Sequence, residues 1–219
     1  MNLLDLFVKI SVQDEASENV ETLSGKFKNG LATAAKVGAA AVSAAATGIA
    51  VLTKKALNNY AEYEQLVGGV DTLFKDSSAK VQEYAANAYK TAGLSANEYM
   101  DTVTSFSASL LQSLGGDTEA AADMANVAIT DMSDNANKMG TDMASIQNAY
   151  QGFAKQNYTM LDNLKLGYGG TKEEMERLLE NATKLSGVEY DISSYADIVD
   201  AIHVIQGEME ISGRTAEEA

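Results

Sequence analysis

The sequence predicts a mainly α fold, with a short amino-terminal strand, a long alanine-rich helix and then a bundle of short helices. The 219 residues contain no proline, whereas an average soluble chain of that length would hold roughly 11, so the strongest helix breaker is missing throughout. A run near the amino terminus is built mostly of alanine, the best helix former. Beyond it, apolar residues recur every three or four positions behind capping residues, as amphipathic helices require.

The first element that we expect is a strand. Residues 5–12 read DLFVKISV, with apolar side chains at every second position, which is the period of a strand. From Gln13 the spacing becomes helical. We expect one long helix that includes the uncharged run at residues 37–52, continues to about Leu66 and ends at a joint formed by Gly68–Gly69.

The uncharged run of this long helix contains a repeat of small residues. Gly38, Ala41, Ala45 and Gly48 lie three to four positions apart, a spacing that lets helices approach closely. A membrane span needs about 20 mainly apolar residues, and this run is shorter and consists mostly of methyl groups. We therefore favour a tightly packed helix of a soluble protein. A latent membrane-active segment and a permanent span remain alternatives.

We expect five to seven short helices between Ser77 and Gly207, separated by glycines or capping residues. Ser95 and Glu98 form a capping box, in which the serine oxygen accepts from a helix amide and the glutamate reaches back to the serine amide. The other caps that we assign are Asp117, Thr141 and a second box, Thr171 with Glu174, and helices end near Gly93, Gly115–Gly116 and Gly140.

The apolar face of each helix predicts the core of the bundle. We divide the chain into residues 1–70, the strand and long helix, and residues 71–219, an acidic helical bundle. The side chains expected to face inward are Tyr99, Val103, Phe106, Leu110 and Leu114; Met124, Val127, Ala128 and Met132; Ile146, Tyr150 and Phe153; Met175, Leu178, Leu179, Ala182 and Leu185; and Ile198, Ile202 and Ile205.

The stretch LGYGGTKEEMERLL, residues 166–179, raises the possibility of a phosphate-binding loop. Such a loop needs a lysine directly after a glycine and a hydroxyl residue after the lysine. Here Thr171 separates the glycines from Lys172, and an acid follows the lysine. Because acidic residues favour the positive start of a helix, we interpret the stretch as a turn that begins a capped helix.

The sequence predicts no catalytic, cofactor or metal site. Cysteine is absent and His203 is the only histidine, so thiol chemistry and multi-histidine metal sites are excluded. Asp131, Asp134, Asn135 and Asn137 carry oxygen atoms but break the spacing of a calcium-binding EF-hand. We expect these four residues on a solvated helix face, and His203 at the surface or at the edge of the core.

The net charge of −15 is distributed unevenly. Residues 1–60 hold six lysines and five acids, whereas the remaining residues hold 10 Lys and Arg against 26 Asp and Glu. An acidic body of this kind repels phosphate backbones, so direct nucleic-acid binding is not expected.

Several stretches, taken together, carry a resemblance to a known family. They are LFVKISV and LSGKFKNGLATAAKVGAAA near the amino terminus, and then YEQLVGGVDTLFK, YAANAYKTAGLSANEYM, FSASLLQSLGGD and ANKMGTDMASIQNAYQGFAKQNYTMLDNLKLGYGGTKEEMERLL. Over nearly the whole chain, from about Leu6 to Gly207, the sequence resembles the tail tape-measure proteins of long-tailed bacteriophages and prophages of Gram-positive bacteria.

The resemblance implies a structural role without catalysis or a cofactor. Such proteins run as extended helices inside the tail tube, and their length sets the length of the tail. The implied partners are tail tube subunits, tail assembly chaperones, further copies of the chain and, during infection, the host membrane. The implied locations are the tail lumen of the virion and, during assembly, the host bacterial cytoplasm.

Two further expectations follow from the comparison with this family. Its members are usually far longer, and the final EISGRTAEEA looks like a pattern cut short, so we expect the chain to be an amino-terminal portion. The alternative function, from a different class, is a membrane-active helical protein that inserts through residues 31–57.

Overall fold

The computed structural model describes residues 61–213, which form helices and connecting turns with no strand among them. The mainly α fold is therefore confirmed for this part of the chain. The predicted strand and the small residues Gly38, Ala41, Ala45 and Gly48 lie outside the described residues, and the expectations about them stay predictions.

The described residues begin in a helix, residues 61–74, which is followed by six α-helices. That number lies within the expected five to seven. The elements are η1 (Lys75–Ser77), α4 (Ser78–Thr91), α5 (Ala96–Ser113), α6 (Thr118–Met139), α7 (Met143–Phe153), η2 (Leu161–Leu164), α8 (Lys172–Ser186) and α9 (Tyr195–Glu208), where η marks a 3-10 helix.

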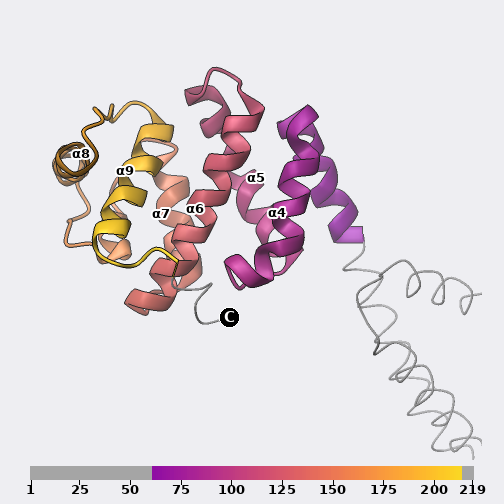
Figure 1. The fold of residues 1–219 in the computed structure, drawn as a ribbon, viewed down its shortest axis with the longest axis horizontal. Coiled ribbons are helices and arrows are strands. Elements are labelled where there is room, and N and C mark those ends of the chain that lie inside the picture. The colour runs from indigo at the N-terminus through magenta and orange to yellow at the C-terminus, as the bar shows by residue number, and fades with distance from the viewer. Residues whose placement is uncertain (1–60, 214–219) are drawn as a thin grey trace, which may run out of the picture. The chain divides into compact units, whose positions relative to one another are not determined.

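Helix α6 is the centre of the bundle. It packs against α4 and α5 on one side and against α7 and α9 on the other, and α8 lies against the outer side of α9 (Figure 1). Its buried residues include Ala121, Ala122, Ala125 and Ala128, here called the alanine stripe. Short side chains let helix axes approach closely, toward the lower end of the usual interaxial range of about 8–10 Å. One helix can then pack against several neighbours.

The predicted helix end at Gly68–Gly69 is wrong, because the helix over residues 61–74 continues through both glycines. Glycine costs about 1 kcal/mol relative to alanine in a helix interior, but packing offsets that cost here. Val70 and Phe74, on the same helix, are fully buried. A Cβ atom on Gly69 would lie 3.6 Å from the Thr104 side chain of α5, so this part of the helix runs close to its neighbour.

Three of the four predicted N-cap residues, Ser95, Asp117 and Thr171, are confirmed, and Thr141 is wrong. The Glu98 amide donates to Ser95 Oγ at 3.3 Å and the Ser95 amide donates to Glu98 Oε2 at 2.9 Å, so the capping box at the start of α5 is complete. Asp117 caps α6 as expected. Helix α7 is capped by Asp142, whose carboxylate accepts from the Ser145 amide at 3.0 Å, and not by the preceding threonine.

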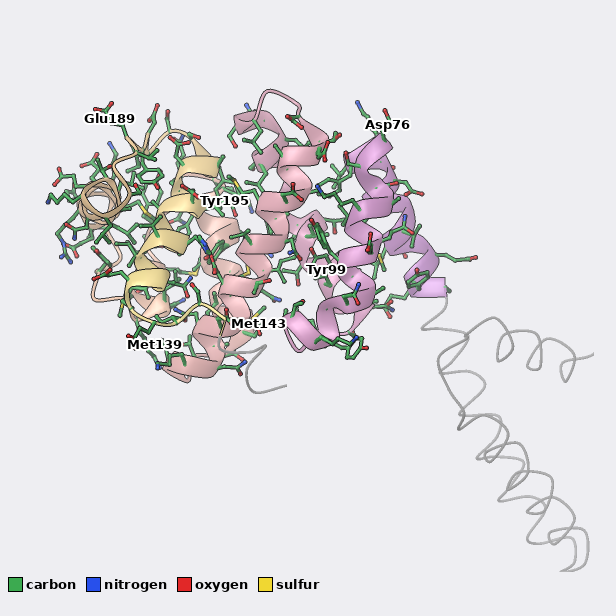
Figure 2. All side chains as sticks on the ribbon, viewed as in Figure 1. Asp76, Tyr99, Met139, Met143, Glu189 and Tyr195 are labelled. Atoms are coloured by element: carbon green, nitrogen blue, oxygen red, sulfur yellow. The ribbon has the colours of Figure 1, made fainter. Side chains whose placement is uncertain are left out.

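Most of the predicted inward-facing residues are buried, with a few corrections. Met124 and Val127 of α6 are only half-buried, because the face that packs on the other helices is centred on the alanine stripe and Ile129. Leu114 is partly buried, and Leu185 is 47% exposed at the end of α8. Figure 2 shows Tyr99 and Tyr195 within the bundle, while the exposed Asp76 and Glu189 lie at its outer ends.

Candidate functional site

The glycine-rich stretch is a closed turn in which the chain supplies its own anion. The Gly169 amide donates to Glu174 Oε2 at 3.0 Å, and Arg177 forms an ion pair with the same carboxylate at 2.6 Å. Arg177 also donates to the Gly167 carbonyl at 2.8 Å and stacks over the Tyr168 ring, 4.4 Å from its centroid. The Gly169 amide and the Arg177 guanidinium, which could otherwise bind an anion, are therefore already bound to a carboxylate of the chain itself.

The second predicted capping box is only half correct. Thr171 caps α8 as expected, with its hydroxyl accepting from the Glu174 amide at 3.2 Å. The reciprocal bond is missing, because the Thr171 amide already donates to the Gly169 carbonyl at 3.0 Å. The glutamate carboxylate reaches two residues further back, to the Gly169 amide, and this longer reach fastens the glycine turn onto the first turn of α8.

Gly170 lies against a second segment of backbone. A Cβ atom built on it would be 2.3 Å from the carbonyl oxygen of Thr159, far inside any normal contact. Glycine is required at this position by the close approach of two loops. Gly170 thus has a packing role, whereas Gly167 has a left-handed φ of 83° with no atom within 4 Å of an added Cβ, as a turn residue would.

The acidic face of α6 was expected to be solvated, and this expectation is wrong. Asp131 is 2% exposed, Asp134 and Asn135 are fully buried, and Asn137 alone of the four is exposed. The face is covered by α9 and the residues that follow it: His203 Nδ1 lies 2.9 Å from an Asp131 oxygen.

The two other buried residues of this face are held by backbone groups. The Gly213 amide donates to Asp134 Oδ2 at 2.6 Å, and Asn135 Nδ2 donates to the Leu164 carbonyl at 2.9 Å. One signal in the sequence could have revealed this burial. Positions 131, 134 and 135 continue the three-to-four spacing of the alanine stripe, and therefore lie on the same face of α6.

Burial and mutual attraction shift the pKa values of Asp131 and His203. Burial raises the pKa of the Asp131 carboxyl, more than the hydrogen bond from His203 lowers it. That hydrogen bond raises the pKa of the half-exposed His203 imidazole, against the opposing effect of its own burial. The pair therefore holds a proton more tightly than the two separate side chains would.

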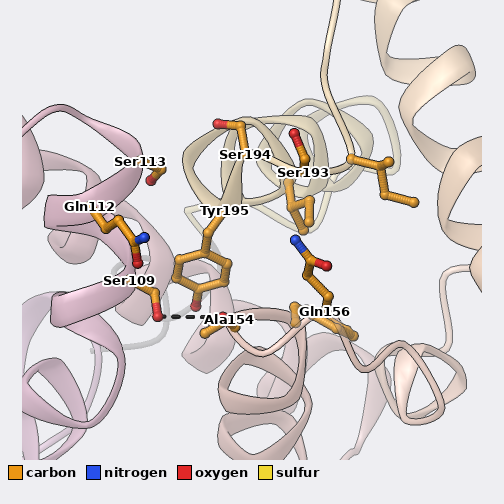
Figure 3. Close-up of a pocket in the computed structure, with 11 residues that line it drawn as sticks. Ser109, Gln112, Ser113, Ala154, Gln156, Ser193, Ser194 and Tyr195 are labelled. Carbon is orange, nitrogen blue, oxygen red and sulfur yellow. Dashed lines mark hydrogen bonds between the residues drawn. The ribbon is translucent and has the colours of Figure 1, made fainter.

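A pocket of about 360 Å³ lies where α5, the end of α7 and the start of α9 meet (Figure 3). In Figure 3, Tyr195 projects from the first turn of α9 toward Ser109 and Ala154. The Tyr195 hydroxyl is buried and has no hydrogen-bond partner within the described part of the chain. The polar lining residues are Ser109, Gln112, Ser113, Gln156, Ser193 and Ser194.

Three serine hydroxyls of this pocket take part in structural bonds, two of them between elements. Ser109 donates to the Ala154 carbonyl at 3.4 Å, Ser113 accepts from the Ala196 amide at 3.2 Å, and Ser194 caps α9. A serine nucleophile needs an adjacent base, and His203 does not line the pocket. The lining offers hydrogen bonds to a polar molecule and contains no serine–histidine pair.

The sequence-predicted residues are distributed over separate places. The caps Ser95 and Thr171 begin different helices and do not form a common site. Among residues 61–213, no group of three or more His, Cys, Asp or Glu side chains is arranged to hold a metal ion. Over the same range, no helix combines the length and the apolar character that crossing a membrane requires.

No protein-family model matches the chain, and no curated protein and no solved structure is similar enough to it to count as a match.

Proposed function

We propose that this protein is a tail tape-measure protein of a long-tailed bacteriophage or prophage of Gram-positive bacteria. The observation that carries the proposal is the long joined resemblance, four stretches of which fall within residues 63–179. The helical bundle is compatible with this proposal. Because the chain has no proline to kink or break a helix, its short helices could join into a longer one. In this role the protein is structural and performs no catalysis.

A ruler must be extended, and the bundle is compact. As one continuous helix at about 1.5 Å per residue, residues 61–213 would reach roughly 230 Å. Reaching that length requires α6 to separate from the helices that it packs against, while the local helical bonds remain. The bundle is then the form of the free chain, and the extended helix is the form inside the tube.

Extension explains why such a chain would need partners. Isolated helices shorter than about 12–15 residues are marginal in water, and α4, α7 and α9 have 14, 11 and 14 residues. Once removed from the bundle, their apolar faces must be covered by something else. Assembly chaperones, tube subunits or further copies of the chain would serve, and these are the partners that we propose.

The proposal is tested by changing the length of the chain in the genome that encodes it. An in-frame duplication of residues 61–213 should lengthen the tails by about 230 Å, and deletion of the same residues should shorten them by a similar amount. The matched control is a length-neutral substitution such as Gly169→Ala. Tail lengths are measured by electron microscopy. Tails of unchanged length in both variants, or neighbouring genes unrelated to tails, would refute the proposal.

The membrane-active alternative is tested on the isolated protein. Leakage of liposomes is measured with the full chain and with a variant that lacks residues 37–52, the uncharged run. Leakage that depends on this run would favour the alternative. No leakage and no lipid binding would remove it, and would leave the tail proposal intact.

A further inference from the structure

Two buried carboxylates on α6 hold the carboxyl-terminal part of the bundle in place. Asp131 binds His203 of α9, with the imidazole Nδ1 at 2.9 and 3.0 Å from the two carboxylate oxygens. One helical turn further on, Asp134 accepts from the Gly213 amide at 2.6 Å. Ile211, between the two attachment points, is 1% exposed and belongs to the core. Helix α9 and the segment after it are thus fastened to the same buried face.

Within residues 61–213, the charged groups that act on His203 are all negative. The groups that act on the imidazole are Asp131 and Asp134 from α6 and Asp200 from its own helix. Tyr150 of α7 is fully buried and faces Asp131 from a third element. A protonated imidazole is the positive charge that compensates Asp131. When the imidazole is neutral, the carboxylate keeps one hydrogen bond but faces further carboxylates in a buried place, which is costly.

We propose that the contact between α6 and α9 is a proton-operated latch. Helix α9 and the residues up to Gly213 stay docked on α6 while His203 carries its proton, and they loosen when the proton leaves. The rest of the bundle does not contain this pair, so the loosening is local. The latch would act in the free chain whether or not the tail role is correct.

The direction of the pH effect follows from the two titrating groups. The pKa of His203 is raised in the folded chain, so its stabilising contribution is complete below the ordinary value of 6.5 and is lost as the pH rises through the folded value. The pKa of Asp131 is also raised, so it too favours the protonated form of the folded state. Both effects weaken the latch as the pH rises, that of Asp131 from its ordinary value of 3.8 upward and that of His203 from 6.5 upward, which is the opposite of an acid-triggered release.

The chain is well suited to a direct test, because it contains one histidine. The imidazole proton resonance in an NMR titration of the full chain therefore reports on His203 without assignment. We expect its pKa above 6.5, and we expect Asp131→Asn to bring it back toward 6.5. A wild-type value at or below 6.5 would overturn the proposal even if the Asp131 variant fails to fold.

Hydrogen exchange measures whether the contact loosens. After correction for intrinsic exchange, the equilibrium constant for opening of the α9 amides should increase between about pH 6 and about pH 9. The expected increase is about tenfold for each unit by which the measured pKa of His203 exceeds 6.5. Amides of α4, which lacks the pair, serve as the internal reference. His203→Gln can keep a donor to Asp131 without titrating, so it should abolish the increase. An equal increase in α4 and α9, or one that persists in this variant, would overturn the latch.

Discussion

Replacing Gly170 by alanine tests the close approach of the two loops. The added Cβ atom would lie 2.3 Å from the Thr159 carbonyl oxygen and 2.9 Å from its carbonyl carbon. Reaching an ordinary contact of 3.4 Å requires the loops to separate by about 1 Å. The atoms in the way are backbone, and the glycine turn is also bound to α8 through Glu174. The contact therefore cannot be relieved by the movement of a flexible side chain.

The cost of this substitution can be worked out against a matched control. Overpacking costs typically 1–3 kcal/mol, and contact with backbone places Gly170→Ala near about 3 kcal/mol. For a domain of this size, that lowers the melting temperature by about 6–12 °C. At Gly169 the nearest atom would be a Glu174 side-chain carbon at 3.5 Å, an ordinary contact. Neither glycine has a left-handed φ, so Gly169→Ala should be neutral or stabilise by about 0.4–1 kcal/mol through the unfolded state.

Thermal and urea unfolding of the full chain, followed by far-ultraviolet circular dichroism, measure the difference between the two variants. Equal melting temperatures for Gly170→Ala and Gly169→Ala would refute the reasoning. A Gly170→Ala variant more stable than the wild type would refute it as well, because the loops could not then lie as close as described. The two substitutions remove the same conformational freedom from the unfolded chain, so their difference reports the packing alone.

Three other predictions concern single interactions, measured as free energies of unfolding from urea titrations. Asp142→Ala should cost about 1 kcal/mol through the lost cap of α7. Thr141→Val removes a buried hydroxyl that has no partner in the described structure and should cost nothing. Equal costs for the two substitutions would contradict the assigned cap. Tyr158→Phe should cost about 0.5–1.5 kcal/mol through the lost bond to a carbonyl at 3.1 Å, while Tyr195→Phe should be neutral or stabilising; the reverse order would contradict the geometry. The pKa of Glu174 is lowered, chiefly by its arginine partner, so its contribution to the free energy of unfolding is present above the ordinary value of 4.5 and is lost as the pH falls through the lower folded value. A stability difference between wild type and Glu174→Gln that does not narrow in acid would contradict the bonding of Glu174 to Arg177 and the Gly169 amide.

The parts of the fold that follow local rules could be predicted from the sequence. The capping box of Ser95 and Glu98 depends on atoms three residues apart, and the structure confirms it. The break predicted at Gly68–Gly69 failed because the propensity of glycine is a local quantity, while the burial of Val70 and Phe74 is a tertiary one. A small propensity cost is easily offset by the burial of two large side chains.

The spacing of α6 could indicate that Asp131 and Asp134 are buried, but their partners could not be predicted by the same local rules. Aspartate is seldom fully buried unless it is paired, so a solvated face was the reasonable expectation for Asp131 and Asp134. Their partners, His203 and the Gly213 amide, lie 72 and 79 residues further along the chain. Pairing over that separation is invisible to spacing rules, and only the arrangement of α9 on α6 reveals it.

The alanine stripe of α6 has a consequence for how this protein can tolerate mutation. Helix α6 packs against four other helices, and the four residues of the alanine stripe are fully buried, so a larger side chain at a stripe position would overpack the core. The acidic exterior has no such restriction, because most surface substitutions change stability by no more than about 0.5 kcal/mol. Among folded variants from random mutagenesis, we therefore expect many substitutions at surface positions and very few in the alanine stripe.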